Sequence, residues 1–131
     1  MNRQILSALV LFAVYFGLSF SAITTSDTVF VKVNETAEVL LPAVANYRRE
    51  VRNADYVKEE HLYRVCNGKN KAKCGFWENV KTKKKVASGA TTYNKNKKAL
   101  IVKKVRETDF GTYMTGNKKK VYYLSKLNIK G

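Results

Sequence analysis

The sequence has little of what enzymes and metal sites require. Its 131 residues include one histidine, one proline, one tryptophan and two cysteines. His61 stands beside Glu59 and Glu60 in a charged stretch, where we expect a surface residue, and no serine or free thiol has a recognisable nucleophile context. Zinc normally takes four protein ligands, more than this inventory offers. We therefore expect neither catalysis, nor a metal site, nor a cofactor.

Acidic residues are also scarce. Asp and Glu number 10 against 25 Lys and Arg, which gives a formal net charge of +15. A field of this sign favours anionic partners, among them sulfated glycans, acidic protein surfaces, anionic lipids and nucleic acids. Nucleic acid is the least expected, because the sequence has no array of alternating aromatic and basic side chains. Lysines also blunt exposed strand edges and keep proteins soluble, so the charge leaves both interpretations open.

Long apolar runs are confined to the N-terminus. There Arg3 precedes an apolar stretch at 5–16, and small residues follow. This order is typical of a secretory signal peptide. We expect residues 1–21 to be cleaved, leaving 22–131 as one secreted, extracellular domain with no membrane span. An uncleaved anchor is the alternative, because the stretch is nearly long enough to cross a bilayer.

The two cysteines, Cys66 and Cys74, are expected to form a disulfide in the oxidising secretory pathway. They enclose a short lysine-rich loop. In the chain-entropy model, closing a loop of this size stabilises the folded state by about 2.5 kcal/mol. The bridge is therefore expected to be structural.

Asn34-Glu35-Thr36 is an N-glycosylation sequon. It lies in a polar turn expected between two strands, where an oligosaccharide would stand clear of the core. Asn34 is therefore a candidate glycosylation site.

Short β-branched and aromatic runs separated by polar turns predict an all-β domain. Their spacing, with no long helix-period segment, favours a sandwich or barrel. The charged stretch at 46–60 is expected to be a long connection with a helical turn. Val86 and Tyr93 are the expected inward-facing residues of the lysine-rich stretch at 81–98. Strands are expected at 29–33, 39–41, 62–66, 74–80, 100–105 and 121–129. The disulfide would then staple a hairpin.

The strongest local signal lies in residues 100–113, which read L-I-V-K-K-V-R-E-T-D-F-G-T-Y. The run has the form L-x-[IV]-x-x-V-x-x-x-D-x-G-x-Y and resembles the strand E to strand F signature of immunoglobulin domains. The resemblance implies an immunoglobulin-like β-sandwich of two antiparallel sheets. The residues that carry it are Leu100, Val102, Val105, Asp109, Gly111 and Tyr113.

The resemblance also implies roles for these residues. Tyr113 would bury its ring and return its hydroxyl to the backbone of the E–F turn, as a tyrosine corner. Val105 would plug the end of the sandwich, and Gly111 would allow close backbone approach. Asp109 would pair with a basic residue, for which Lys85 is the candidate.

The chain departs from the family at its core disulfide. Thr115 stands where the second core cysteine is expected, and alignment of strand B puts Ala43 at the first. The strand C tryptophan is missing too, so Leu62 or Tyr63 is expected to fill its position. Packing must therefore replace an intersheet bridge worth about 4 kcal/mol.

The lysines fall into groups in the expected hairpin loops and edges, where they are candidate sites for an anion or an acidic partner. The resemblance implies a non-enzymatic recognition protein. Its partner would be an extracellular or cell-surface protein, including another immunoglobulin-like protein, or a sulfated glycan. The alternative is a cationic host-defence or glycosaminoglycan-binding effector. The groups are Lys69, Lys71 and Lys73 in the disulfide loop, then Lys83, Lys84 and Lys85, then a set at 95–98, and Lys118, Lys119 and Lys120 in the F–G turn.

Overall fold

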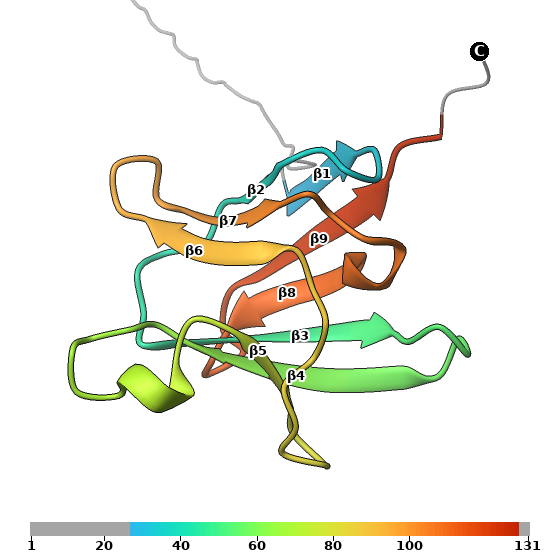
Figure 1. Cartoon of the computed structure of the whole chain (residues 1–131). Coiled ribbons are helices and arrows are strands. Elements are labelled where there is room, and N and C mark those ends of the chain that lie inside the picture. Colours follow the sequence, from blue (N-terminus) through green and yellow to red (C-terminus); the bar gives the residue numbers. More distant parts are fainter. Residues whose placement is uncertain (1–26, 129–131) are drawn as a thin grey trace, which may run out of the picture.

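The computed structural model describes residues 27–128, so the expected signal peptide lies outside the described residues. Within this range the chain is all-β, as the sequence predicts, and forms two sheets (Figure 1). One sheet has the strand order β1-β9-β8-β3-β4-β5 and the other β2-β7-β6. Neighbours are antiparallel except β1 and β9, which are parallel. The strands are β1 Thr28–Val31, β2 Ala37–Val39, β3 Asn46–Arg52, β4 Lys58–Arg64, β5 Trp77–Asn79, β6 Ala90–Asn94, β7 Ala99–Lys103, β8 Gly111–Thr115 and β9 Val121–Lys126.

The segment expected to be a long connection with a helical turn is a β-hairpin, so that prediction is wrong. Strands β3 and β4 pair antiparallel along their whole length. Alternate residues of β3, namely Tyr47, Arg49 and Val51, are buried, which is the period of a half-buried strand. The sequence does not reveal this period, because an arginine stands at the centre of the buried face and gives the segment the charged composition of a solvent-exposed one. Asn53 closes the turn, since its Oδ1 accepts hydrogen bonds from two backbone N–H groups.

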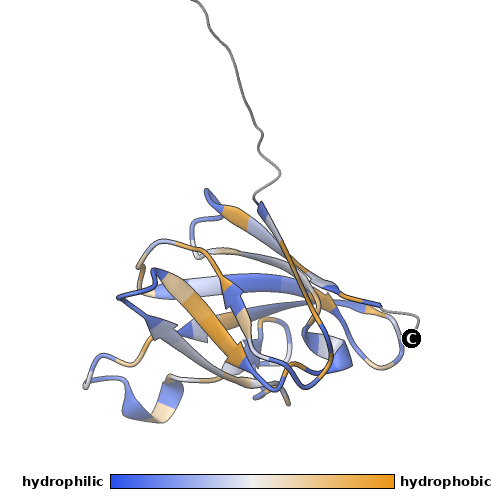
Figure 2. Cartoon of the chain, turned by 90° about the horizontal axis from the view of Figure 1, so that it is seen from above, coloured by the Kyte–Doolittle hydropathy of each residue, from blue (hydrophilic) through white to orange (hydrophobic). Residues whose placement is uncertain are grey.

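Aromatic rings of the six-stranded sheet fill the centre of the core. The Trp77 ring packs edge-on against Tyr113, with centroids 5.5 Å apart, and tilted against Tyr63 at 5.3 Å. Of the two residues expected to fill the tryptophan position, Tyr63 is buried and Leu62 is half-buried. The hydrophobic residues concentrate along the strands, as Figure 2 shows. The remaining core members come from both sheets and their connections: Val31, Ala37, Val39, Leu41, Tyr47, Leu100, Val102, Val105, Tyr122 and Leu124.

A charged pair is buried against these rings. Arg49 Nη1 lies 2.9 Å from Asp109 Oδ1, and neither side chain is exposed. Ser88 Oγ donates a further hydrogen bond to the same oxygen. The expectation that Lys85 pairs with Asp109 is wrong, because Lys85 is exposed with its Nζ 5.4 Å from the centre of the Phe76 ring. Arg49 replaces it because β3 aims the guanidinium into the core.

His61 is buried as well, although the sequence predicts a surface residue. Its Nδ1 accepts a hydrogen bond of 3.0 Å from Arg49 Nε, and its Nε2 lies 2.9 Å from Glu59 Oε1. Burial lowers the pKa of His61 below its ordinary value of 6.5, against the opposing effect of Glu59. At neutral pH the ring is therefore uncharged, with Nδ1 as acceptor and Nε2–H as donor.

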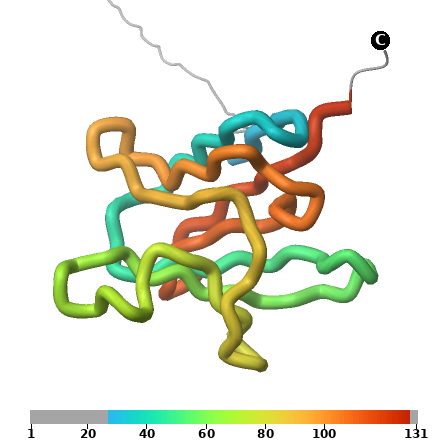
Figure 3. The backbone as a smooth tube through the Cα atoms, viewed as in Figure 1, coloured from blue at the N-terminus to red at the C-terminus, as the bar shows by residue number. Residues whose placement is uncertain are grey.

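Four connections meet at one end of the sandwich, which we call the loop end. Register pairs the start of β3 with the ends of β4 and β8, and the end of β2 with the start of β7. The backbone N–H of Val65 donates to the Ala45 carbonyl, and that of Gly116 donates to the carbonyl of Asn46 at the start of β3. Figures 1 and 3 show the four connections along the left side of the molecule. The connections of the loop end are 40–45, 65–76, 95–98 and 116–120.

Candidate functional site

The loop end carries a concentration of positive charge. Three of its four connections hold nine lysines, and none of the four contains an aspartate or a glutamate. All nine side chains are exposed. Because the three lysine-bearing connections join strands of both sheets, the charge spans the full thickness of the sandwich. These lysines are Lys69, Lys71, Lys73, Lys95, Lys97, Lys98, Lys118, Lys119 and Lys120.

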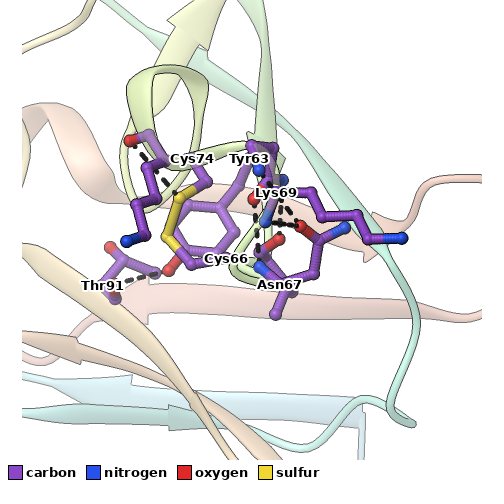
Figure 4. The surroundings of a disulfide bond; sticks show 9 residues. Tyr63, Cys66, Asn67, Lys69, Cys74 and Thr91 are labelled. Carbon is purple, nitrogen blue, oxygen red and sulfur yellow. Dashed lines mark hydrogen bonds between the residues drawn. A yellow bond between two sulfur atoms is a disulfide. The ribbon is translucent and has the colours of Figure 1, made fainter.

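The disulfide loop is held by covalent and polar contacts. Cys66 and Cys74 are bonded, as predicted, with their Cα atoms 5.0 Å apart. Asn67 Oδ1 accepts a hydrogen bond of 2.9 Å from the Lys69 backbone N–H, and Asn70 Nδ2 donates to the Val65 carbonyl. The Lys69 side chain points away from the disulfide (Figure 4). The loop therefore presents its lysines from a constrained backbone.

In the other two lysine-bearing connections an asparagine side chain also accepts a hydrogen bond from the backbone N–H of a lysine. Asn94 Oδ1 accepts from the Lys97 backbone N–H at 3.0 Å, and Asn117 Oδ1 accepts from that of Lys119 at 3.1 Å. Asparagine side chains commonly hold a turn in this way, by accepting from the backbone two or three residues on. Each lysine run is thus preceded by an asparagine that fixes its backbone. An asparagine two or three residues before a lysine is the feature of the sequence that marks these turns.

The carboxylates close to the loop end form ion pairs with basic side chains. Glu78 is paired with Arg64 at 2.8 Å, and this contact holds the pKa of the glutamate below its ordinary value. Glu60 lies 2.7 Å from a guanidinium nitrogen of Arg48 and 3.7 Å from Lys118 Nζ. A third pair joins Glu38 and Lys97, both of them largely exposed. The ion pairs at this end therefore leave most of the nine lysines without a carboxylate contact among the described residues.

The structure keeps Lys83, Lys84 and Lys85 apart from this group. They lie in the turn after β5, which runs away from the loop end and projects at the bottom of Figure 1. Asn79 organises this turn by accepting from two backbone N–H groups. The predicted lysine candidates thus divide into two separate surfaces.

Asn34 is exposed in the turn between β1 and β2, which lies at the end of the sandwich opposite the lysines. Its backbone N–H donates to the Val105 carbonyl at 2.8 Å. An oligosaccharide attached to this side chain would therefore leave the loop end uncovered.

The motif residues lie in the core and around the turn between β7 and β8. Tyr113 Oη donates a hydrogen bond of 2.6 Å to the Asp109 carbonyl. A side chain at Gly111 would put a Cβ 2.1 Å from the Glu50 carbonyl oxygen, so only glycine fits there. Leu100, Val102 and Val105 have no exposed surface.

The two positions aligned with the missing core cysteines differ from one another. Thr115 is buried, at 2% exposure. Ala43 is exposed and lies outside the strands, whereas Leu41 is buried.

Within residues 27–128, no group of three or more His, Cys, Asp or Glu side chains could hold a metal ion. In the same range, no helix is long and apolar enough to cross a membrane. No protein-family model matches the chain, and a search of curated proteins finds no similar sequence.

Proposed function

We propose that the chain is a secreted, non-enzymatic binding domain with an immunoglobulin-like fold of the variable type, and that it takes its partner at the loop end. Variable-type domains have nine strands, because two strands are added to the sheet formed by strands G, F and C. The strand order supports this assignment: β9, β8, β3, β4 and β5 correspond to G, F, C, C′ and C″, and β2, β7 and β6 to B, E and D. In this assignment Leu62 and Tyr63 lie on C′, so neither occupies the strand C tryptophan position expected for them.

Contacts around the turn between β7 and β8 also support the fold assignment. A tyrosine two residues before the second core cysteine of the family normally bonds the backbone a few residues upstream. Tyr113, two residues before Thr115, makes that bond to Asp109. The leader sequence and the disulfide support an extracellular location.

The observation that carries the binding function is the lysine concentration at the loop end. Binding residues are commonly placed on loops held by a rigid scaffold. Here nine lysines without an intervening carboxylate occupy loops fixed by asparagine contacts and a disulfide. A solubilising function alone would not require loops that carry lysines and no carboxylate.

A pair of matched variants tests this proposal. Lys118→Gln, Lys119→Gln and Lys120→Gln together remove three charges from the loop end. Lys81→Gln, Lys83→Gln and Lys84→Gln remove three from the turn after β5. Each set includes one residue of positive φ, Lys118 at 63° and Lys83 at 65°, so the backbone strain is matched.

Binding of the mature protein to intact cells is the measurement. The loop-end variant should lose at least tenfold in apparent affinity, and the control should stay within about threefold of the wild type. Equal losses from both variants would contradict a localised site and indicate attraction by net charge alone.

The net charge of +15 supports one other function, that of a cationic host-defence effector. Membrane disruption requires an apolar surface beside the charge. Among residues 27–128, five of the six large hydrophobic side chains that are exposed lie outside the four connections of the loop end, and the exception is Leu40. Release of dye from anionic vesicles at micromolar protein would favour this function over recognition.

A further inference from the structure

We propose that the ligand of the loop end is a sulfated polysaccharide, a linear chain of the heparan sulfate class. This inference rests on the proposed function, since it names the partner class of the same site. Three features of the loops carry it: the kind of cation, the lack of exposed aromatic anchors, and the spread of the lysines over three connections.

The cations of the loop end are all lysines. None of its four connections contains an arginine. Arginine presents a planar fork that suits bidentate recognition of one carboxylate or phosphate, whereas lysine is a point charge on a flexible stem. Sulfate groups on a polysaccharide vary in position along the chain. A set of flexible point charges fits such a ligand better than a set of rigid forks.

The loops lack the anchors that other polyanionic or acidic partners use. Protein interfaces depend on a few buried Trp, Tyr and Arg side chains, and single-stranded nucleic acids stack their bases on exposed aromatic rings. The four connections contain one aromatic residue, Phe76, which is half-buried beside Lys85. Contacts to a ligand at this end are therefore made by ammonium groups and backbone amides.

The position of the three lysine connections favours a long ligand over a single anion. The 116–120 turn and the disulfide loop are separated by about three strand spacings, or about 14 Å. The 95–98 turn belongs to the other sheet, which lies about 10 Å away. One anionic group cannot contact all three, but a flexible polyanionic chain can contact them in succession. Affinity should therefore rise with the length of the ligand.

The fixed backbone of these loops lowers the cost of binding. Ordering a loop upon association opposes binding, and a loop already held in place avoids that cost. Asn67, Asn94 and Asn117 hold the backbones of the three lysine runs in the unliganded protein. Only the lysine side chains remain to be ordered by the ligand.

The first experiment measures retention on heparin and titration with heparin oligosaccharides of increasing length. The mature wild-type protein should bind octasaccharides at least tenfold more tightly than disaccharides. By the counterion-release relation, replacing Lys118, Lys119 and Lys120 with Gln should lower the slope of log affinity against log salt by about two to three. Replacing Lys69, Lys71 and Lys73 with Gln should have a similar effect. The Lys81, Lys83 and Lys84 control should change the slope by less than one.

Binding of other polyanions tests whether the loop end recognises sulfate groups or negative charge in general. O-desulfated heparin retains its carboxylates, and its affinity should be at least tenfold lower than that of heparin. Double-stranded DNA and poly-glutamate of similar charge should also bind less tightly than heparin. Equal or tighter binding of desulfated heparin, DNA or poly-glutamate would overturn the assignment to a sulfated chain.

The second experiment separates this inference from the proposed function. Cells treated with heparan sulfate lyases should lose binding of the wild-type protein. If binding survives the treatment but is still lost in the Lys118, Lys119 and Lys120 variant, the loop end binds a protein and the inference about sulfated glycan is wrong. If neither treatment nor variant changes binding, the loop-end function itself is wrong. Circular dichroism and thermal unfolding of each variant establish that the fold is retained.

Discussion

Arg49 and Asp109 form an ion pair of 2.9 Å in which neither side chain has any exposed surface. They come from strand β3 and from the turn before β8, sixty residues apart, so the pair joins two distant segments. The guanidinium carbon also lies 4.3 Å from the centre of the Trp77 ring. Its Nη2 has no hydrogen-bond partner within the described range, and the ring face is the compensating contact.

Removing one member of this pair should destabilise the fold strongly. Asp109→Ala leaves a buried guanidinium without its counter-charge, and such changes cost about 3–5 kcal/mol. Replacing both members, with Arg49→Met and Asp109→Leu, should cost less than the sum of the single changes, because no charge is then left unpaired. Urea unfolding of the wild type, of Arg49→Met, of Asp109→Leu and of the double variant provides the double-mutant cycle, and Asp109→Ala is measured beside them. A loss below about 1 kcal/mol for Asp109→Ala would contradict the buried pair.

Stability should depend on pH through His61. Burial lowers the pKa of this ring in the folded state, so below pH 6.5 the unfolded chain binds a proton that the folded protein does not. Stability is therefore constant above about pH 7 and falls as the pH drops from 6.5 toward the lowered folded pKa. Unfolding midpoints measured between pH 5 and 8 check this. The His61→Gln variant should show no decline in that window.

A second loss of stability should follow at lower pH. Burial opposes ionisation of Asp109, but Arg49, Ser88 and backbone N–H donors hold its pKa below the ordinary value. The pKa of Glu59 is lowered too, by hydrogen bonds from His61 and Asn53. The stability that these carboxylates supply is present above about pH 4 and is lost as the pH falls through their folded pKa values. The part of this loss that comes from Asp109 should persist in the His61→Gln variant, whereas the part that comes from Glu59 should shrink, because His61 makes the largest contribution to the lowered pKa of Glu59.

The buried hydroxyl of Tyr113 gives a third prediction. Tyr113 Oη donates to the Asp109 carbonyl and accepts from Arg49 Nη1, and burial raises its pKa to about 12. Tyr113→Phe keeps the ring but leaves both partners without this hydroxyl, which should cost about 1–3 kcal/mol. Guanidinium unfolding is the measurement. An unchanged midpoint would mean that the hydroxyl contributes nothing to the folded state.

Local patterns predicted part of this structure, and the physical reasons for the failures are specific. The all-β class and the Cys66–Cys74 bridge follow from short apolar runs and from a lone cysteine pair. The strand containing Arg49 was missed because a charge on its buried face mimics a solvated segment. Its stabilisation comes from Asp109, which is distant in sequence. No local pattern contains that pairing.

From the lysine groups we expect the disulfide loop and the F–G turn to present one surface, but the missing strand left open whether the two lie at the same end of the sheet. Each hairpin reverses the direction of the chain, so missing one strand moves the next turn to the wrong end of the sheet. Without β3, the disulfide loop and the 116–120 turn could not be assigned to one end. With β3 in place, the loop follows β4 and meets the turn after β8. The lysines could be named from the sequence, but their common location depends on the strand order.

The disulfide gives a fourth prediction, for stability and binding together. Replacing Cys66 and Cys74 with Ser should cost about 2.5 kcal/mol, because the unfolded chain regains the freedom of the loop. The loop lysines would then be presented from a less constrained backbone. The heparin affinity of this variant should therefore fall by more than the affinity of the Lys81, Lys83 and Lys84 control variant falls. Thermal unfolding and heparin titration test the two effects separately. Unchanged affinity would mean that the constraint does not contribute to binding.

A designed glycan tests which end of the domain is used. Lys119→Thr creates a sequon that begins at the exposed Asn117, in the middle of the 116–120 turn. An oligosaccharide added there by a secreting cell should block the loop end, and binding to cells and to heparin should be lost. Lys119→Val removes the same charge and has a similar shape but creates no sequon, so it should reduce binding only modestly. Asn34→Gln removes the natural sequon at the opposite end and should leave binding unchanged. Mass spectrometry verifies occupancy at each site, and full binding by protein that carries a glycan at Asn117 would reject the loop end as the binding surface.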